Sequence, residues 1–289
     1  MLQGARVLRV QVPPPTPQNP SLSSGGFRCL VALYADLMAD EFELLVDLHI
    51  DGERQGPGSE EATRRAIALT GLEGASNLKI ADIGCGTGAS TLVLANVLDA
   101  HVVAVDFLPP FLERLNDVAQ RRALADRITT SSTSMDELEF EDESLDVVWS
   151  EGAIYNMGFE NGIGSWRHFL KPGGVLAVSE ITWLTHQRPA ELHDHWMNEY
   201  PEISTASQKL AALEAAGYSP IGYFPLPESC WLDHYYRPMQ DRFAAFLERH
   251  DHSPAANEIV EAEQFEIDLY ERFSDYVSYG FYIATRTAS

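Results

Sequence analysis

The sequence has little cysteine and few basic residues. Its three cysteines, Cys29, Cys85 and Cys230, are too few and too scattered for a disulfide framework or a four-thiolate metal site, so we expect a reducing, cytoplasmic compartment. Only 20 lysines and arginines stand against 43 aspartates and glutamates, which gives a formal net charge of -23. Because a phosphate backbone needs clustered lysine and arginine, we expect no nucleic-acid partner.

Long hydrophobic runs are also missing. No apolar run approaches the roughly 20 residues that a membrane-spanning helix needs, and the N-terminus lacks the apolar core of a signal peptide. We therefore expect neither secretion nor a membrane partner. The apolar fraction of 45% and the aromatic fraction of 10% are typical of a globular chain, and 289 residues are enough for one domain with insertions.

The N-terminal part of the chain differs in composition from the rest. Residues 1–26 contain clustered prolines followed by serine and glycine, which predicts a disordered tail. From residue 27 to about residue 50, apolar residues recur at helical spacing, and Ser59 followed by two glutamates predicts the cap of a helix that ends near Leu69. We expect residues 27–76 to form a helical cap over the remaining chain.

Strand-like and helix-like segments alternate beyond Asn77, which is typical of a parallel sheet with helices on both faces. The Lys-Pro-Gly-Gly run at residues 171–174 predicts a helix stop and a sharp turn into the next strand. The predicted strands are residues 78–83, 101–106, 128–132, 145–150, 175–180, 220–226 and 279–287. The predicted helices are residues 89–98, 110–123, 163–169 and 205–216, with a largely helical stretch at 227–278.

A glycine-rich turn, the glycine loop, follows the first of these strands and reads Asp82-Ile83-Gly84-Cys85-Gly86-Thr87-Gly88. Glycines at such a turn allow the backbone to approach a ligand closely. Dinucleotide-binding loops have the spacing Gly-x-Gly-x-x-Gly, whereas these glycines alternate strictly, which favours S-adenosylmethionine (SAM) over NAD. We expect Cys85 to fill the space beneath the turn and assign it no catalysis.

Acidic residues follow the next two strands. Asp106 ends the second strand, where a carboxylate can accept hydrogen bonds from both hydroxyls of a ribose, a device that NAD enzymes share. After the third strand, Asp136 is placed to accept from an adenine amino group, and Met135 to cover the ring. Both predictions point to an adenosine-containing ligand.

The fourth strand is apolar and delivers Ser150 and Glu151 to the carboxyl edge, where α/β sheets bind ligands. Glu151 is the best candidate for work at the reacting end, and Tyr155 lies just beyond it. An oxygen or protonated amine nucleophile would need a base, for which Glu151, His195 and His234 are candidates, whereas a thiolate or thioether would need none. The sequence leaves this choice open.

The order of these elements, with the turn at 171–174, resembles class I SAM-dependent methyltransferases along roughly residues 78–185. A closer resemblance, at residues 54–58, 149–156 and 228–231, is to uncharacterised bacterial small-molecule methyltransferases and covers nearly the whole chain after the tail. The resemblance implies that the glycine loop contacts the methionine part of SAM, that Asp106 holds the ribose and that Asp136 faces the adenine.

We expect an α/β fold with a Rossmann-like, doubly wound, seven-stranded sheet whose last strand is antiparallel. In this hypothesis the methyltransferase domain spans residues 77–289, and a helical insert at residues 228–278 acts as a lid. The catalytic candidates are Glu151, Tyr155 and His234. The expected cofactor-binding residues are Asp82, Gly84, Cys85, Gly86, Thr87, Asp106, Phe107, Ser134, Met135, Asp136, Ser150 and Glu151. We expect no metal site.

The function that we expect is methyl transfer from SAM to a small molecule. The acidity of the chain and its many aromatic residues favour an amine or a sulfur acceptor, a thiol or a methionine-like thioether, because aromatic rings attract cations. A SAM-binding enzyme of different chemistry, a nicotinamide oxidoreductase and a non-catalytic SAM sensor stay open as alternatives. A homodimer also stays open.

Overall fold

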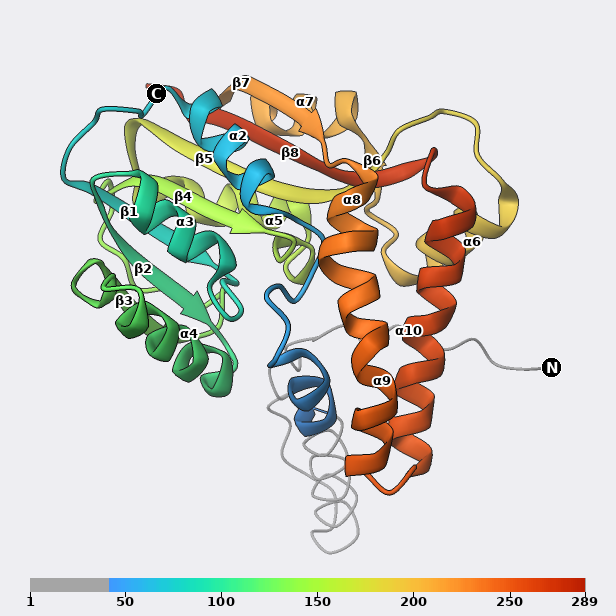
Figure 1. Cartoon of the computed structure of the whole chain (residues 1–289). Helices are drawn as coiled ribbons and strands as arrows, with labels where there is room; N and C mark the ends of the chain where they lie inside the picture. The colour runs from blue at the N-terminus through green and yellow to red at the C-terminus, as the bar shows by residue number, and fades with distance from the viewer. Residues whose placement is uncertain (1–41, 289) are drawn as a thin grey trace, which may run out of the picture.

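A twisted sheet runs through the molecule (Figure 1), and its strands follow the order β3-β2-β1-β4-β5-β8-β7, with β6 paired to β5. The computed structural model describes residues 42–288, so the predicted tail and residues 27–41 of the predicted cap lie outside the described residues. The strands are β1 Leu78–Ile83, β2 Ala100–Asp106, β3 Ile128–Ser132, β4 Leu145–Glu151, β5 Leu170–Trp183, β6 Ser204–Thr205, β7 Tyr218–Pro225 and β8 Val277–Arg286.

Strand directions follow the prediction. The pairs β1–β2, β2–β3, β1–β4 and β4–β5 are parallel, whereas β8 is antiparallel to both β5 and β7. The predicted α/β sheet with an antiparallel last strand is therefore confirmed. It has eight strands rather than seven, because two residues of β6 pair with Thr182 and Trp183 at the end of β5.

Helices connect the strands on both faces of the sheet. The described part of the chain contains a helical segment at residues 42–49 and a series of longer elements. These are α2 Glu60–Thr70, α3 Ala89–Val97, α4 Pro109–Arg121, η1 Ala125–Arg127, η2 Ile154–Asn156, α5 Phe159–Trp166, η3 Arg167–Phe169, α6 Ala190–Glu199, α7 Ala206–Ala215, α8 Glu228–Trp231, η4 Leu232–Tyr236, α9 Arg237–Arg249 and α10 Pro254–Phe273. None of them is both long and apolar enough to cross a membrane.

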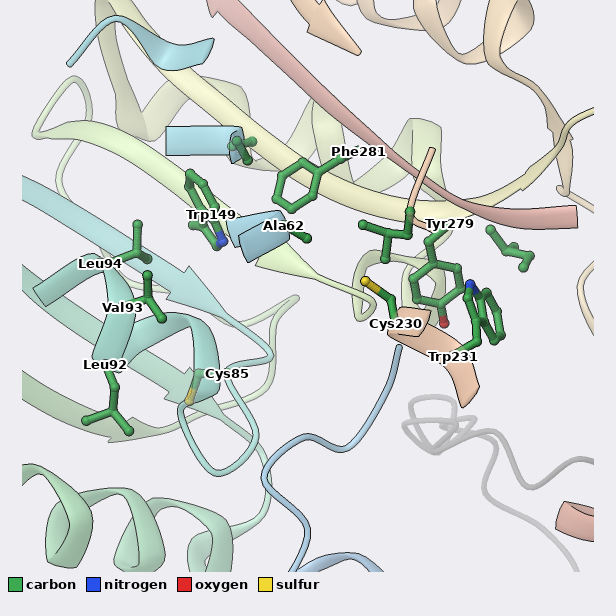
Figure 2. Packing of buried hydrophobic residues seen from close by; sticks show 14 of the residues in the cluster. Ala62, Cys85, Leu92, Val93, Leu94, Trp149, Cys230, Trp231, Tyr279 and Phe281 are labelled. Atoms are coloured by element: carbon green, nitrogen blue, oxygen red, sulfur yellow. The ribbon is translucent and has the colours of Figure 1, made fainter. Parts of the chain in front are cut away.

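Alternate residues of the central strands enter two separate hydrophobic clusters. Trp149 of β4 belongs to the cluster under α2, α3 and α4, whereas Val148 belongs to the cluster under α5 and α7. The same alternation places Phe281 and Tyr282 of β8 on opposite faces. Figure 2 shows Trp149 and Phe281 close to Ala62 of α2, with ring centroids 5.4 Å apart in an edge-on arrangement. Burial on both faces explains why these strands are almost continuously apolar.

Some predicted boundaries were wrong. The structure begins α5 at Phe159, four residues before the predicted start, and it continues β5 through residues 171–174 instead of turning there. A register shift between Leu145 and Val147 on the neighbouring β4 accommodates this proline- and glycine-containing segment as an irregularity of the strand. The sequence also gave no signal for α6, because Leu192 is the one fully buried side chain in it.

The stretch between β7 and β8 folds as predicted into helices, and α9 and α10 form an antiparallel pair that extends beyond the sheet (Figure 1). The helical segment at residues 42–49 contacts this pair through two ion pairs. Asp47 accepts a hydrogen bond from Arg249 at 2.7 Å, and the ring of His49 lies 3.8 Å from the carboxylate of Glu263. These contacts place residues 42–49 beside the insert at 228–278, although the two are far apart in sequence.

A buried ion pair fixes α7 to the sheet. Nζ of Lys209 lies 3.3 Å from Oε1 of Glu180 in β5, and the two side chains are 1% and 0% exposed. The ammonium group also lies 4.4 Å from the centre of the Phe159 ring. Burial lowers the pKa of Lys209 and raises the pKa of Glu180, so each charge depends on the other.

Replacement of Lys209 by methionine should lower the free energy of unfolding by about 3 to 5 kcal/mol, because Glu180 is left as an uncompensated buried charge. The double variant Lys209→Met/Glu180→Gln should regain most of this loss. Urea unfolding followed by circular dichroism measures both values. A single variant as stable as the wild type would show that the pair contributes nothing to the fold.

Candidate functional site

A cavity of about 290 Å³ opens at the carboxyl edge of the sheet, where β1 and β4 lie side by side. The connections from these two strands leave in opposite directions, and such a switch point is the usual ligand site of an open α/β sheet. The cavity is lined by residues from the glycine loop, from the ends of β2 and β4, from residues 42–57 and from the insert. Segments from both halves of the chain therefore form one site.

The glycine loop lies at the wall of this cavity, and two of its glycines are required by their surroundings. Gly84 has φ +71, and a Cβ there would lie 2.3 Å from Cβ of Ala153. Gly86 has φ +55, and a Cβ there would lie 2.4 Å from Oε1 of Gln55. Positive φ and the lack of space both exclude larger residues. Glycine at these two positions therefore lets Ala153 and Gln55 pack directly against the loop.

Asp106 lies at the end of β2 and its carboxylate lines the cavity beside the glycine loop. Its two oxygens accept backbone hydrogen bonds from Gly86 at 2.8 Å and from Leu108 at 2.9 Å. Burial raises the pKa of this carboxyl, and the two amide groups partly oppose the shift. Since each carboxylate oxygen has two lone pairs, Asp106 can still accept hydrogen bonds from a pair of hydroxyl groups.

Residues 52–58, here called the strap, cross the glycine loop from the outside. Oε1 of Gln55 accepts from the backbone N of Thr87 at 2.9 Å and from its hydroxyl at 3.0 Å. Nε2 of Gln55 donates to the carbonyls of His49 and Gly52, each at 3.2 Å. One amide side chain therefore ties the glycine loop to the strap and to the helical segment before it.

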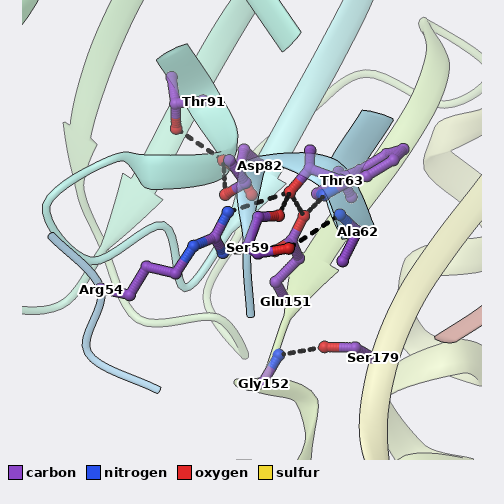
Figure 3. Close-up of polar contacts among 11 residues, drawn as sticks. Arg54, Ser59, Ala62, Thr63, Asp82, Thr91, Glu151, Gly152 and Ser179 are labelled. Carbon is purple, nitrogen blue, oxygen red and sulfur yellow. Dashed lines mark hydrogen bonds and ion pairs between the residues drawn. The ribbon is translucent and has the colours of Figure 1, made fainter. Parts of the chain in front are cut away.

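The strap is also joined to β4 by an ion pair (Figure 3). Nη1 of Arg54 donates to Oε2 of Glu151 at 2.7 Å, and Nη2 donates to the hydroxyl of Thr63 in α2 at 3.1 Å. Oε1 of Glu151 accepts from Thr63 at 2.7 Å and from the indole of Trp149 at 3.0 Å. Both oxygens of Glu151 are thus occupied, and its side chain is only 7% exposed. The structure does not favour Glu151 as a proton-accepting base.

The remaining wall of the cavity is aromatic and acidic. Glu199 of α6 and Glu263 and Glu266 of α10 face the same space. The hydroxyl of Tyr236 donates to Oε1 of Glu266 at 2.8 Å. Burial and the nearby charge of Glu263 raise the pKa of Glu266 to about 7. The aromatic residues of this wall are Tyr155, Trp196, Tyr200, Trp231, Tyr235 and Tyr279.

The structure brings most of the predicted site residues together. Within the described residues, it places nine of them in the lining of the cavity, namely Gly84, Cys85, Gly86, Asp106, Phe107, Ser134, Met135, Glu151 and Tyr155. Burial raises the pKa of the Cys85 thiol well above its ordinary value, which disfavours the thiolate form. Met135 is held by its carbonyl, which accepts from the indole of Trp166 at 3.1 Å.

Five predicted residues lie outside this lining. His234 is exposed, because the π-helical turn η4 directs its neighbour Tyr235 to the cavity instead. Asp136 is exposed and accepts a hydrogen bond from the hydroxyl of Ser134. The other three, Asp82, Thr87 and Ser150, are buried beneath the site. Their positions favour roles in supporting the site rather than in touching a ligand.

Sequence reasoning missed Arg54, Gln55 and the glutamates of α10. The sequence draws attention to residues 54–58 only through a resemblance. Glu263 and Glu266 are two acidic residues in a helix that contains several, so their residue type does not separate them from solvent-facing neighbours. The available signal is the helical spacing of Ile259 and Ile267, which are buried and mark the inner face of α10.

Comparisons with known proteins agree with this geometry. Residues 80–174 match the family model described as a methyltransferase domain. The chain is 28% identical over 239 residues to 27-O-demethylrifamycin SV methyltransferase of Amycolatopsis mediterranei (strain S699), covering 78% of this chain and 84% of that protein. It is 26% identical to a sterol 24-C-methyltransferase of Debaryomyces hansenii, covering 63% of this chain and about half, 52%, of that relative.

The crystal structure of a SAM-dependent methyltransferase from Geobacter sulfurreducens in complex with S-adenosyl-L-homocysteine is similar in fold. Its TM-score is 0.72 at 18% identity, and the match covers 85% of this chain and 97% of that one. The fold is therefore that of class I SAM-binding proteins. With the matched domain, it identifies the chain as a SAM-dependent methyltransferase whose cofactor is SAM, which decides the choice between SAM and NAD.

Asp82 supports the glycine loop from below and gives the site a pH-dependent stability. Its Oδ2 accepts from Ser90 at 2.8 Å and from Thr91 at 2.6 Å. Burial raises its pKa from 3.8 to about 7, and the two hydroxyl groups only partly oppose this. Between these pH values the folded protein keeps a proton that the unfolded chain has lost, so stability falls as the pH rises.

Replacement of Asp82 by asparagine removes this titration while keeping an oxygen for Thr91. The free energy of unfolding of Asp82→Asn relative to the wild type should therefore rise between pH 4 and pH 7, on the order of 4 kcal/mol for a shift from 3.8 to about 7. Urea unfolding across this range measures the difference, with Asp126→Asn at an exposed position as control. A difference that does not change with pH would contradict the prediction.

Proposed function

We propose that the protein transfers the methyl group of SAM to a small amine that enters the cavity as an ammonium ion. The observation that carries this proposal is the wall in which Glu199, Glu263 and Glu266 line one space with six aromatic rings. Carboxylates attract an ammonium ion, and aromatic faces contribute about 0.5 to 2 kcal/mol each. An amine explains this charge better than the sulfur acceptors that the sequence also allowed.

The residues around the glycine loop fit SAM. Gly84 and Gly86 line the cavity, so a ligand there can lie against the glycine loop, and the Asp106 carboxylate would hold the ribose hydroxyls. Met135 would cover the adenine from the same side of the cavity. Bound SAM supplies an activated methyl group, so the protein mainly has to place a nucleophile in line with it.

An ammonium acceptor must lose a proton before its nitrogen can attack. Glu266 is suited to take that proton, because its pKa of about 7 lies near neutral pH and its side chain faces the cavity. The hydroxyl of Tyr236 fixes the orientation of the carboxyl. Tyr155 would contribute through its ring, as part of the aromatic wall, rather than as an acid or base.

The insert at residues 228–278 supplies Trp231, Tyr235 and both α10 glutamates to the cavity, so we also propose that it acts as the lid of the acceptor site. The absence of nucleic-acid and membrane partners, the homodimer and the cytoplasmic location stay predictions. A SAM-binding enzyme of different chemistry stays the alternative, because the fold by itself does not specify the reaction.

A screen of small acceptors read by the release of S-adenosylhomocysteine should find turnover with amines. The panel pairs each amine with the alcohol and the thiol of the same carbon skeleton, so that only the nucleophile and its charge differ. Methyl-labelled SAM should transfer its label to the amine. Turnover with the alcohol or thiol partner but not with the amine would sink the proposal, and label retained on the cofactor would favour the alternative.

Replacement of Glu266 by glutamine should lower kcat for the amine by roughly 10²- to 10⁴-fold, the scale of general base catalysis, while the affinity for S-adenosylhomocysteine stays the same. In the wild type, kcat should rise as the pH passes through about 7 and Glu266 ionises, and this step should vanish in the variant. Glu258→Gln, on the exposed face of α10, is the matched control. An unchanged pH profile would show that Glu266 only supports the wall.

A further inference from the structure

We propose that Arg54 binds the carboxylate of the methionine part of SAM, and that Glu151 and Thr63 hold the guanidinium in place for it. The inference deepens the proposed function and rests on it only in placing SAM in this cavity. It gives Arg54 a cofactor-binding role that the sequence did not reveal. It also turns Glu151 from a catalytic candidate into a positioning residue.

The charges that line the cavity favour this assignment. SAM carries a sulfonium, an ammonium and a carboxylate group, and the carboxylate needs a cationic partner. Among the described residues of the lining, the acidic side chains are Asp106, Glu151, Glu199, Glu263 and Glu266, and the basic ones are Arg54 and His49. His49 already lies 3.8 Å from Glu263 and is charged only when protonated. Arg54 is always charged, so it is the best site for an anion in an otherwise acidic cavity.

The hydrogen bonds of Arg54 leave capacity for a second anion. Two of its five N–H groups are used, one on Glu151 at 2.7 Å and one on Thr63 at 3.1 Å. The side chain is 11% exposed and lines the cavity. Within the described part of the chain, its other N–H groups have no recorded hydrogen-bond acceptor. A planar guanidinium matches a carboxylate with two parallel N–H groups. Arg54 can therefore keep Glu151 and still receive a ligand carboxylate.

The position of Arg54 agrees with a role at the cofactor. Its neighbour Gln55 accepts from both the backbone and the hydroxyl of Thr87, so the strap is fixed against the glycine loop. The charge of Arg54 also lowers the pKa of Asp82, at the end of β1, against the larger effect of burial. Figure 3 shows the guanidinium close to Asp82, Thr63 and Glu151.

Isothermal titration calorimetry with two ligands separates this role from a structural one. S-adenosylhomocysteine has the carboxylate, and its decarboxylated analogue lacks only that group and keeps the ammonium. Arg54→Met should weaken binding of S-adenosylhomocysteine on the order of 10- to 100-fold and change binding of the analogue much less. Arg54→Lys should show an intermediate loss, because it keeps the charge but not the paired N–H groups.

Two further variants complete the test. Arg64→Met removes an exposed arginine of α2 and should leave both affinities unchanged. Glu151→Gln should weaken S-adenosylhomocysteine more than the analogue, but less than Arg54→Met does, because it only loosens the guanidinium. Thermal unfolding checks that each variant is folded. If Arg54→Met does not fold, the affinities of Arg54→Lys for the two ligands are compared instead.

An equal loss for both ligands, or no loss for either, would overturn the inference. The outcome is independent of the methyl acceptor, because the measurement is binding and needs no turnover. A selective loss of affinity for S-adenosylhomocysteine with no amine turnover would support the Arg54 assignment and reject the amine as acceptor. Amine turnover without a selective loss of affinity would support the amine and reject the Arg54 assignment.

Discussion

The carboxylate of Glu151 is the point at which the separate parts of this enzyme are joined. It accepts hydrogen bonds from Arg54 of the strap, from Thr63 of α2 and from Trp149 of β4. Those residues come from segments up to 97 positions apart in sequence. Removing a charge from a pair this deeply buried leaves the other charge uncompensated, which is far more costly than losing an exposed pair. The pair therefore helps to hold the strap on the sheet, whereas Gln55 separately holds the strap on the glycine loop.

The acidic wall of the cavity also places carboxyl groups close together in a partly buried site. Burial and, to a lesser extent, the nearby charge of Glu263 oppose ionisation of Glu266, and its raised pKa is the result. A cationic ligand would relieve that repulsion, so binding of an ammonium ion and ionisation of Glu266 favour each other. Acidic side chains gathered in a buried cavity destabilise the fold, and a cationic ligand can offset this effect. Asp82 carries a different cost, the burial of a single carboxyl group that two hydroxyl donors only partly offset.

Much of the fold was predictable because its signals are local. Strict alternation of glycines from Gly84 to Gly88, apolar strands ending in Asp106 and Glu151, and the capping serine Ser59 all appear in short windows of sequence. The strand ends were predicted to within one or two residues in the parallel part of the sheet, since burial on both faces makes each strand apolar throughout. The bulged start of β5 was not, because a proline and two glycines look the same in a turn and in an irregular strand.

The sequence does not predict which side chains contact one another in the site. A carboxylate at the end of a buried strand is predictable, and Glu151 was found in this way, but its chemistry depends on a cation that lies 97 residues away. Likewise, His234 and Tyr235 are neighbours in the π-helical turn η4, and it is Tyr235 that lines the cavity while His234 is exposed. A residue type and its position on a strand therefore predict where a site lies. Contacts between distant segments determine which charged side chains are paired and which are available for catalysis. Only the folded chain brings those segments together.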